Sequence, residues 1–162
     1  METIAYMLSD NPYGESKITH LSLIRNSIGK FGAKLLAPAL RTNRSLTFLN
    51  LSENGLGVSG VVSICSALST NSTLETLSLY NCKFNVDGAR ALGTALKTNT
   101  SLKFLDLGDN RIRITGLKSI TDGILANPGS KVSEMSIKWN FISDLGFTAL
   151  FEALVLPKAD RP

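Results

Sequence analysis

The sequence LTFLNLSENGL at residues 46–56 has a close copy, LKFLDLGDNRI, at residues 102–112. Both follow the pattern LxxLxLxxNxL, and further copies of this pattern fill the chain at spacings of 28, 28, 28 and 30 residues. The copies begin at Ile18, Leu46, Leu74, Leu102 and Val132. Because chance does not repeat such a pattern at a nearly fixed spacing, the chain is built from a repeated structural unit.

The second half of each unit has a different period. In the second unit Gly60 is followed by Ile64 and Leu68, and a glycine with apolar residues four and eight positions later recurs in every unit. Alternating apolar residues in the first half predict a short β-strand, and apolar residues spaced by four predict an α-helix that packs one side inward. Each unit is therefore predicted to be strand, turn and helix. Asparagines at positions 43, 71, 99 and 127 are predicted to end the helices in left-handed turns.

The repeats resemble the leucine-rich repeat superfamily, in particular its 28-residue ribonuclease-inhibitor-like class. The resemblance rests on the pattern above and on the ninth position of each unit, where that class has asparagine or cysteine. This position holds Asn26, Asn54, Cys82, Asn110 and Asn140. We expect the asparagines to hydrogen-bond the backbone of their own turn and of the next unit. The resemblance implies an α/β fold, a curved leucine-rich repeat solenoid with a parallel β-sheet on its concave face and α-helices on its convex face.

The repeats divide the chain into three parts. Residues 1–17 are predicted to form a partial N-terminal capping helix and a loop, because Ile4 and Leu8 match the apolar spacing of the later helices. Residues 18–156 form five leucine-rich repeats (18–45, 46–73, 74–101, 102–131 and 132–156), and residues 157–162 form a C-terminal tail. Large apolar residues of the last unit either seal the end of the stack or dock a partner. These residues are Phe147, Phe151, Val155 and Leu156. We expect a monomer or a weak end-to-end association.

The composition is that of one globular domain, with 162 residues, 43% apolar, 19% charged and a net charge of +4. The sequence has no segment that approaches the roughly 18 apolar residues of a membrane span, and its N-terminus lacks the basic region of a signal peptide. Two cysteines are too few for a disulfide framework, which favours a reducing compartment. We therefore expect a cytoplasmic location, with the nucleus as the alternative. The charge is mild and evenly spread, and it does not indicate a nucleic-acid partner.

The sequence motifs do not indicate an enzyme. Gly55, Gly57 and Gly60 match the GxGxxG pattern of dinucleotide-binding turns, but the glycine at the third slot recurs in every repeat and other residue types fill the first two slots elsewhere. Phosphate-loop, zinc-protease and serine-nucleophile motifs are absent from the sequence. His20 is the single histidine, and the acidic residues of separate repeats show no matched acid–base pair. We expect no catalytic residue, no cofactor and no metal.

The variable positions of the predicted strands carry the functional signal. The third, fifth, seventh and eighth positions of each unit should face or border the concave side, since side chains alternate along a strand. These positions gather large aromatic residues among acidic ones, a composition typical of protein-binding hot spots. The predicted partner-binding residues are Phe48, Asn50, Glu53, Tyr80, Phe104, Asp106, Asp109, Lys138 and Trp139. In the alternative interpretation, Phe48 and Phe104 only cover the neighbouring strands.

Outward helix positions form a second candidate surface. The position two residues after each repeat glycine holds Lys34, Arg90 and Lys118 in the first, third and fourth units, which gives a broken basic stripe. A solvated helix face is one interpretation of this stripe, and a contact with an acidic partner or an anionic surface is the other.

Together these observations favour a non-enzymatic protein–protein interaction module, such as an adaptor, scaffold or inhibitor, that binds a protein partner through the concave face. The repeat class also occurs in the Ran GTPase-activating protein, which supplies one alternative, a Ran-type regulator. That family is longer and usually carries an acidic tail, whereas this sequence ends in PKADRP. A second alternative is a fragment of a larger leucine-rich repeat sensor or of a cytoskeletal or axonemal protein. The identity of the partner does not follow from the sequence.

Overall fold

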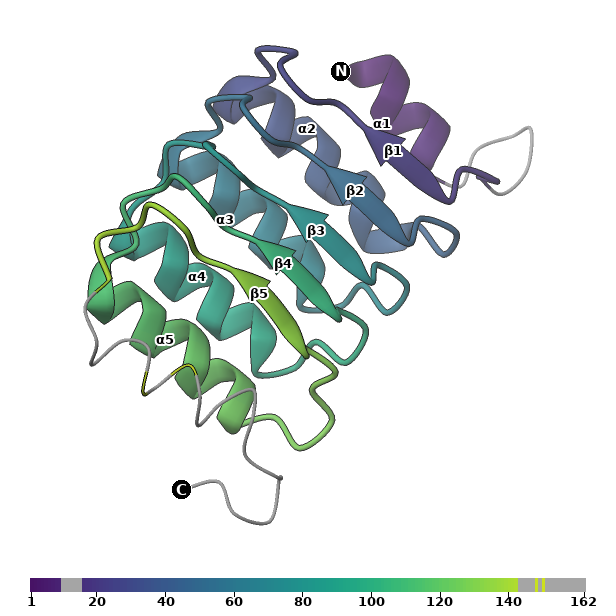
Figure 1. Cartoon of the computed structure of the whole chain (residues 1–162). Helices are drawn as coiled ribbons and strands as arrows, with labels where there is room; N and C mark the ends of the chain where they lie inside the picture. Colours follow the sequence, from purple (N-terminus) through teal and green to yellow (C-terminus); the bar gives the residue numbers. More distant parts are fainter. Residues whose placement is uncertain (10–15, 143–147, 149, 151–162) are drawn as a thin grey trace.

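The computed structural model describes residues 1–9, 16–142, 148 and 150. Strands and helices alternate along the chain, and the helices lie on one side of a single sheet (Figure 1). The strands are β1 (His20–Ser22), β2 (Phe48–Asn50), β3 (Thr76–Ser78), β4 (Phe104–Asp106) and β5 (Glu134–Ser136). The helices are α1 (Glu2–Leu8), α2 (Gly29–Thr42), α3 (Gly57–Leu68), α4 (Val86–Leu96) and α5 (Arg113–Leu125). This arrangement is the α/β solenoid that the repeat pattern predicts.

The sheet is parallel and its strands follow the order of the sequence, β1-β2-β3-β4-β5. Equivalent repeat positions pair directly, so that Leu49 lies opposite Leu77 and Leu77 opposite Leu105. A helix occupies about 10 Å of the stack, whereas neighbouring strands lie about 4.8 Å apart. The stack therefore bends toward the sheet, and the exposed sheet face is the concave one.

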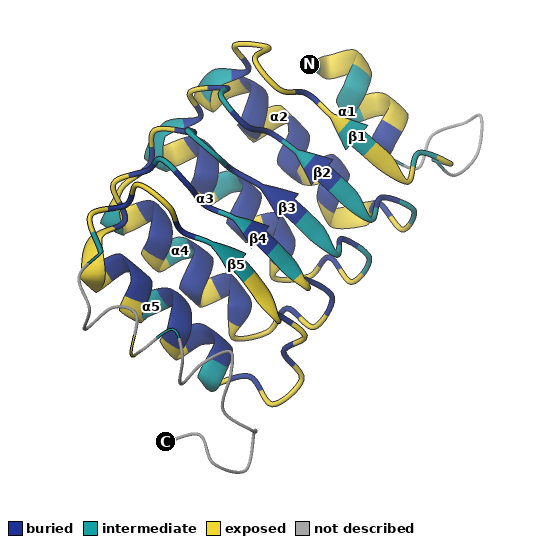
Figure 2. Cartoon of the chain, viewed as in Figure 1, coloured by how far each residue is buried: buried dark blue, intermediate teal, exposed yellow. Residues whose placement is uncertain are grey.

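The hydrophobic core lies between the sheet and the helices. The inward strand residues Leu49, Leu77 and Leu105 are fully buried, as are Ile64 and Leu92 on the inner sides of α3 and α4. Figure 2 shows this burial along the middle of the inner strands and on the helices behind them. Burial of each such side chain contributes about 1.5–3 kcal/mol, which makes the inward repeat positions the main source of stability.

Asparagines at the ninth repeat position link neighbouring repeats. The side chain of Asn110 donates a hydrogen bond to the carbonyl oxygen of Leu79 in the preceding repeat, at 3.0 Å. Cys82 fills the same place in its repeat, where its Sγ donates to the carbonyl oxygen of Leu51 at 3.2 Å. The prediction of a bond to the next unit is therefore wrong in direction. In the first repeat, which follows α1, Asn26 is exposed.

A second asparagine ladder lies at the C-terminal ends of the helices. Asn71 Nδ2 donates to the carbonyl oxygen of Leu40 in the preceding repeat at 2.7 Å, and Asn71 Oδ1 accepts from the backbone N–H of Leu74 at 2.8 Å. The other members are Asn43, Asn99 and Asn127. The predicted left-handed turns at these residues are wrong, because none of the four has a positive φ. These asparagines instead satisfy buried backbone groups between repeats.

The N-terminal end of the stack is covered by α1. Leu8 is fully buried, and its carbonyl oxygen accepts a hydrogen bond from Asn43 Nδ2 at 2.7 Å, so α1 takes the place of a preceding repeat in the asparagine ladder. No helix in the described part of the chain is long and apolar enough to cross a membrane. The predicted C-terminal apolar group lies outside the described residues, as does the tail 157–162.

Candidate functional site

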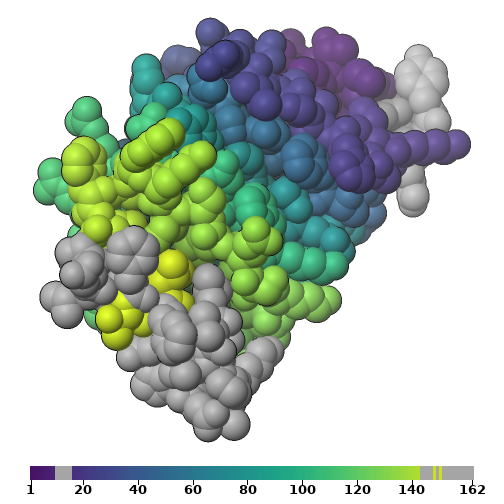
Figure 3. Space-filling view, in the orientation of Figure 1, coloured from purple at the N-terminus to yellow at the C-terminus, as the bar shows by residue number. Residues whose placement is uncertain are grey.

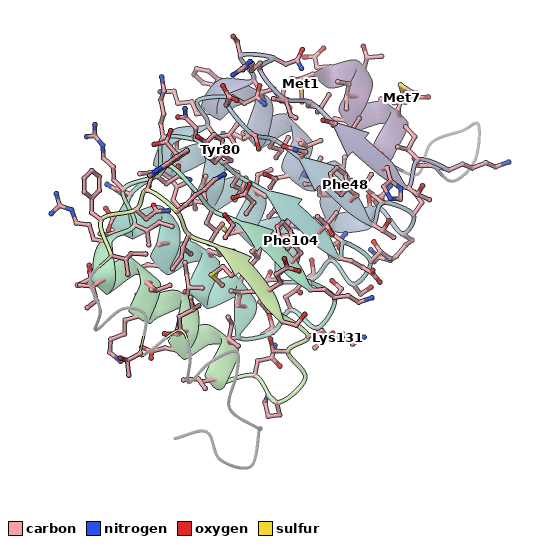
Figure 4. All side chains as sticks on the ribbon, in the orientation of Figure 1. Met1, Met7, Phe48, Tyr80, Phe104 and Lys131 are labelled. Atoms are coloured by element: carbon pink, nitrogen blue, oxygen red, sulfur yellow. The ribbon has the colours of Figure 1, made fainter. Side chains whose placement is uncertain are left out.

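Phe48 and Phe104 lie at equivalent positions of β2 and β4, with Thr76 of β3 between them in the register. Both are on the sheet face seen in Figure 4, and the space-filling view shows that side chains fill the gaps between the ribbons (Figure 3). Both rings are half-buried. Phe48 stacks on His20 of β1 with ring centroids 5.7 Å apart and an interplanar angle of 18°. The rings therefore cover the sheet in part and also leave surface accessible.

Two of the predicted binding residues have structural bonds. Asn50 Oδ1 accepts from the backbone N–H of Ser52 at 2.9 Å, and Asp106 Oδ1 accepts from the backbone N–H of Gly108 at 3.1 Å. The hydroxyls of Ser52 and Ser78 lie 2.7 Å apart, and Ser78 Oγ donates to Asp106 Oδ2 at 3.3 Å. These bonds fix the turns after β2 and β4 and link them through Ser78 of β3. Their sequence signal is the polar fifth position of every repeat, which holds Ser22, Asn50, Ser78, Asp106 and Ser136.

Three side chains meet above Gly108, and we call them the aromatic platform: Tyr80, Lys138 and Trp139. The Tyr80 and Trp139 rings form an edge contact, with centroids 6.1 Å apart and an interplanar angle of 61°. Lys138 Nζ lies 5.2 Å from the centroid of Tyr80 and 5.1 Å from that of Trp139, which is within cation–π range. A Cβ added to Gly108 would lie 2.9 Å from Tyr80 Cδ2 and 3.0 Å from Lys138 Cγ. The missing side chain at 108 therefore makes room for the platform.

The seventh and eighth repeat positions lie in a turn. Each strand ends at the fifth position, which corrects the expectation that strand alternation extends to the eighth. The eighth position has a left-handed backbone in all five repeats, with φ between 46° and 58°. It holds Arg25, Glu53, Asn81, Asp109 and Trp139. Neighbouring turns bring Arg25 Nε within 2.7 Å of Glu53 Oε2, and they leave Trp139 66% exposed.

Carboxylates surround the platform on the concave side. Partial burial raises the pKa of the Tyr80 phenol above its usual value, and the negative charges of Asp109, Glu53 and Asp106 raise it further, in that order. The phenol therefore stays protonated at neutral pH and can donate a hydrogen bond. Of the nine predicted residues, six lie in this region, namely Glu53, Tyr80, Asp106, Asp109, Lys138 and Trp139. The other three, Phe48, Asn50 and Phe104, lie on strands β2 and β4.

The GxGxxG motif is explained by the repeat. Gly55 and Gly57 have φ values of +58° and +63°, and a Cβ added to either would meet nothing within 4 Å. The turn position of Gly55 has the same left-handed backbone in other repeats, where it holds Ser27, Lys83 and Phe141. Gly60 instead lies at a helix contact, since its added Cβ would approach Ala33 Cβ of α2 to 3.2 Å. Turn geometry and helix packing therefore account for the motif.

The sequence reasoning missed a hollow on the loop side of the sheet. Its volume is about 990 Å³, and Lys83, Arg111, Trp139 and Phe141 are among its lining residues. Phe141 is 79% exposed, the most of the large hydrophobic residues that the structure describes. A signal for this hollow exists in the sequence, because Lys83, Arg111 and Phe141 stand at the tenth repeat position, which holds serine and glycine in the first two repeats.

Two of the three basic residues of the helix stripe, Arg90 and Lys118, have partners within their own helices. Arg90 pairs with Asp87 at 3.0 Å, and Lys118 pairs with Asp122 at 3.2 Å. All four side chains are largely exposed. Such pairs are typical of a solvated helix face.

The cysteines are not activated as nucleophiles. Cys65 and Cys82 are buried, and burial raises the pKa of each thiol to about 12. Both therefore stay protonated at neutral pH, whereas nucleophilic attack requires the thiolate. Within residues 1–9 and 16–142, no group of three His, Cys, Asp or Glu side chains is arranged to hold a metal ion.

Comparisons with known proteins agree with this geometry. A family model described as "Leucine Rich repeat" matches residues 42–65, 70–93 and 98–120. A sequence search of curated proteins gives no match. Among solved structures, the chain is similar to leiomodin-1 actin-binding site 2, with a TM-score of 0.74, 16% identity and coverage of 84% of this chain and 78% of that one. It is also similar to the tropomodulin C-terminal domain of Caenorhabditis elegans, with a TM-score of 0.78, 13% identity and coverage of 94% and 90%.

Proposed function

We propose that this chain, which is a leucine-rich repeat protein, is a non-enzymatic module that binds a protein partner through its concave face. The aromatic platform carries the proposal. Tyr and Trp are enriched in hot spots, because each offers a large rigid apolar area with a polar group at its edge. Trp139 is 66% exposed, so a partner that covers it would remove a large apolar area from water.

The platform is formed before any partner binds. Tyr80 and Trp139 are in edge contact, and Lys138 lies against both rings. Side chains that are already ordered lose less conformational entropy on binding. A partner therefore gains from a surface that stacking across three repeats has organised.

The charges around the platform indicate the chemistry of the partner. Glu53, Asp106 and Asp109 all act on the Tyr80 phenol, and they outnumber the cations Arg25 and Lys138 at this face. A partner surface with Lys or Arg among apolar residues fits this pattern, because opposite charges speed encounter and set orientation. The described residues around the platform thus include more carboxylates than cations, although the whole chain has a net charge of +4.

Affinity capture from cell lysate tests the proposal. The wild-type chain is compared with Tyr80→Ala/Trp139→Ala, and bound proteins are identified by mass spectrometry. A matched control, Val62→Ala/Lys118→Ala, shortens two exposed side chains on the convex helices. We expect a partner that the wild type and the control retain and the platform variant loses, with circular dichroism showing that all three are folded. Retention of the same partners by the platform variant would contradict the proposal.

Actin is the first named partner to test. One structural relative is the actin-binding site 2 of leiomodin-1, which supports the cytoskeletal alternative for this chain. Co-sedimentation with actin filaments measures this directly, with the platform variant beside the wild type. Pelleting of the wild type alone would identify actin as the partner. If neither protein pellets, actin is excluded as the partner, and affinity capture remains the test of binding by the concave face.

A further inference from the structure

We propose that the hollow on the loop side of the sheet is a second binding site, which takes an extended acidic peptide segment of a protein partner. The hollow lies among the turns between strands and helices, and its volume is about 990 Å³. We call it the loop-side groove. It shares Trp139 with the platform, but its other features belong to different residues.

The charges of the groove favour an acidic occupant. Lys83 and Arg111 line it, and Arg113 follows two residues later. All three are exposed, and none of them forms an ion pair with another described residue. Asp109 is the single acidic residue of the lining. An acidic segment therefore finds two lining cations against one lining carboxylate, and neither cation is in an ion pair with a described residue.

The apolar part of the groove consists of two exposed aromatic side chains. Trp139 is 66% exposed and Phe141 is 79% exposed, and both line the hollow. Aromatic and arginine side chains together are the composition of interface hot spots. The occupant is therefore an acidic segment that also contains an apolar residue.

The side chains of the groove extend from a turn that every repeat contains. Lys83 and Phe141 stand at the tenth repeat position with φ values of 60° and 56°, and the first two repeats hold Ser27 and Gly55 there with φ values of 51° and 58°. The same left-handed turn therefore carries a small residue in the first two repeats and a large groove-lining side chain in the third and fifth.

The dimensions of the groove set the length of the segment. Its lining residues run from the third repeat, with Lys83, to the fifth, with Phe141, and helix α3 of the second repeat adds Val58. Strands in a sheet are spaced by about 4.8 Å, so three repeat steps span about 14 Å, which an extended chain covers with about four residues. Four to five ordered residues of an acidic segment fill this span.

Fluorescence anisotropy with a defined probe tests the proposal. The probe is a fluorescein-labelled ten-residue peptide of Asp and Glu with two Phe near its centre. The test variant is Lys83→Glu/Arg111→Glu. Its control is Lys34→Glu/Lys97→Glu, which changes the net charge equally at exposed sites away from the groove. We expect saturable binding that weakens at least about tenfold in the test variant, less than about twofold in the control, and at least about threefold in Phe141→Ala.

Several outcomes would overturn the proposal. If the control variant binds the probe as weakly as the test variant, the effect is one of net charge alone. If the wild type does not bind the probe, the groove is not a site for acidic peptides. Tighter binding of a single-stranded oligonucleotide of equal charge would assign the groove to nucleic acid instead. The intrinsic emission of Trp139, the single tryptophan, gives a second readout, which should change on titration of the wild type and not of the test variant. Phe48→Ala, which changes the concave sheet at a residue outside the groove lining, should bind the probe like the wild type, so a failure of the groove proposal is distinct from a failure of the concave-face proposal.

Discussion

Substitution of Gly93 by alanine should destabilise the stack, because α4 and α5 contact each other through their backbones. A Cβ added to Gly93 would lie 2.1 Å from the carbonyl oxygen and 2.6 Å from the carbonyl carbon of Ser119. On the other side of the contact, a Cβ added to Gly123 would lie 2.1 Å from the carbonyl oxygen of Gly93. These neighbours are helix backbone, which cannot rotate away as a flexible side chain does.

The size of the effect follows from the contact distance. An ordinary contact between carbon and a carbonyl oxygen is about 3.3 Å, so Gly93→Ala requires the helices to separate by roughly 1 Å. A gap of this size forfeits a quarter to a half of the dispersion energy of the contacts that it opens. Overpacking of a core costs about 1–3 kcal/mol, and the higher helix propensity of alanine returns about 1 kcal/mol. Because the clash is with backbone, we expect a net loss near 2 kcal/mol.

Urea denaturation followed by circular dichroism measures this loss. For a chain of this size a loss of about 2 kcal/mol lowers Tm by roughly 4–8 °C. Thr94→Ala is the matched control, since Thr94 is the next residue of α4 and is exposed; it should change the free energy of unfolding by less than about 0.5 kcal/mol. A Gly93→Ala variant as stable as the wild type would refute the close backbone contact of α4 and α5.

Other predictions concern the core, the asparagine ladder and the thiols. Leu105→Ala, at a fully buried strand position, should cost about 2–5 kcal/mol in urea denaturation, and a loss below 1 kcal/mol would mean that the strand register is wrong. Asn110→Ala leaves the carbonyl oxygen of Leu79 without its donor at 3.0 Å and should cost about 1–3 kcal/mol by the same assay, whereas a neutral effect would show that the ladder is dispensable. The pKa values of Cys65 and Cys82 are raised to about 12 by folding, so protons are held more tightly in the folded state, and stability should be complete below pH 9 and fall between about 9 and 12. The urea midpoint of Cys65→Ala should change less between pH 9 and 12 than that of the wild type. An identical pH dependence of the two proteins would contradict the raised pKa of Cys65.

Much of the fold follows from the sequence because the repeat pattern is local and recurs. Leucines at fixed positions place the same residue of every strand in register, as the pairs from Leu21 to Leu105 show. The glycine and the apolar residues after it define the buried side of each helix. These features depend on residues within one unit, so a single copy of the pattern contains the information for all of them.

The features that the sequence did not reveal depend on contacts between units. The platform exists because Gly108 of one repeat lies between Tyr80 and Lys138 of the two adjacent repeats. The direction of the asparagine bonds is likewise a relation between turns, which the pattern of one unit does not contain. The sequence does not indicate the left-handed backbone at Lys83 and Phe141, because glycine occurs at such turn positions only in the first two repeats.

Site-specific photo-cross-linking measures whether the concave face contacts a bound protein. Benzoylphenylalanine in place of Phe104 puts an aromatic photoreactive group on the middle of the sheet, and the same residue in place of Val62 puts it on the convex side. After irradiation with the partner that affinity capture identifies, we expect a cross-linked product from position 104 and none from position 62. A product from position 62 alone would contradict binding by the concave face.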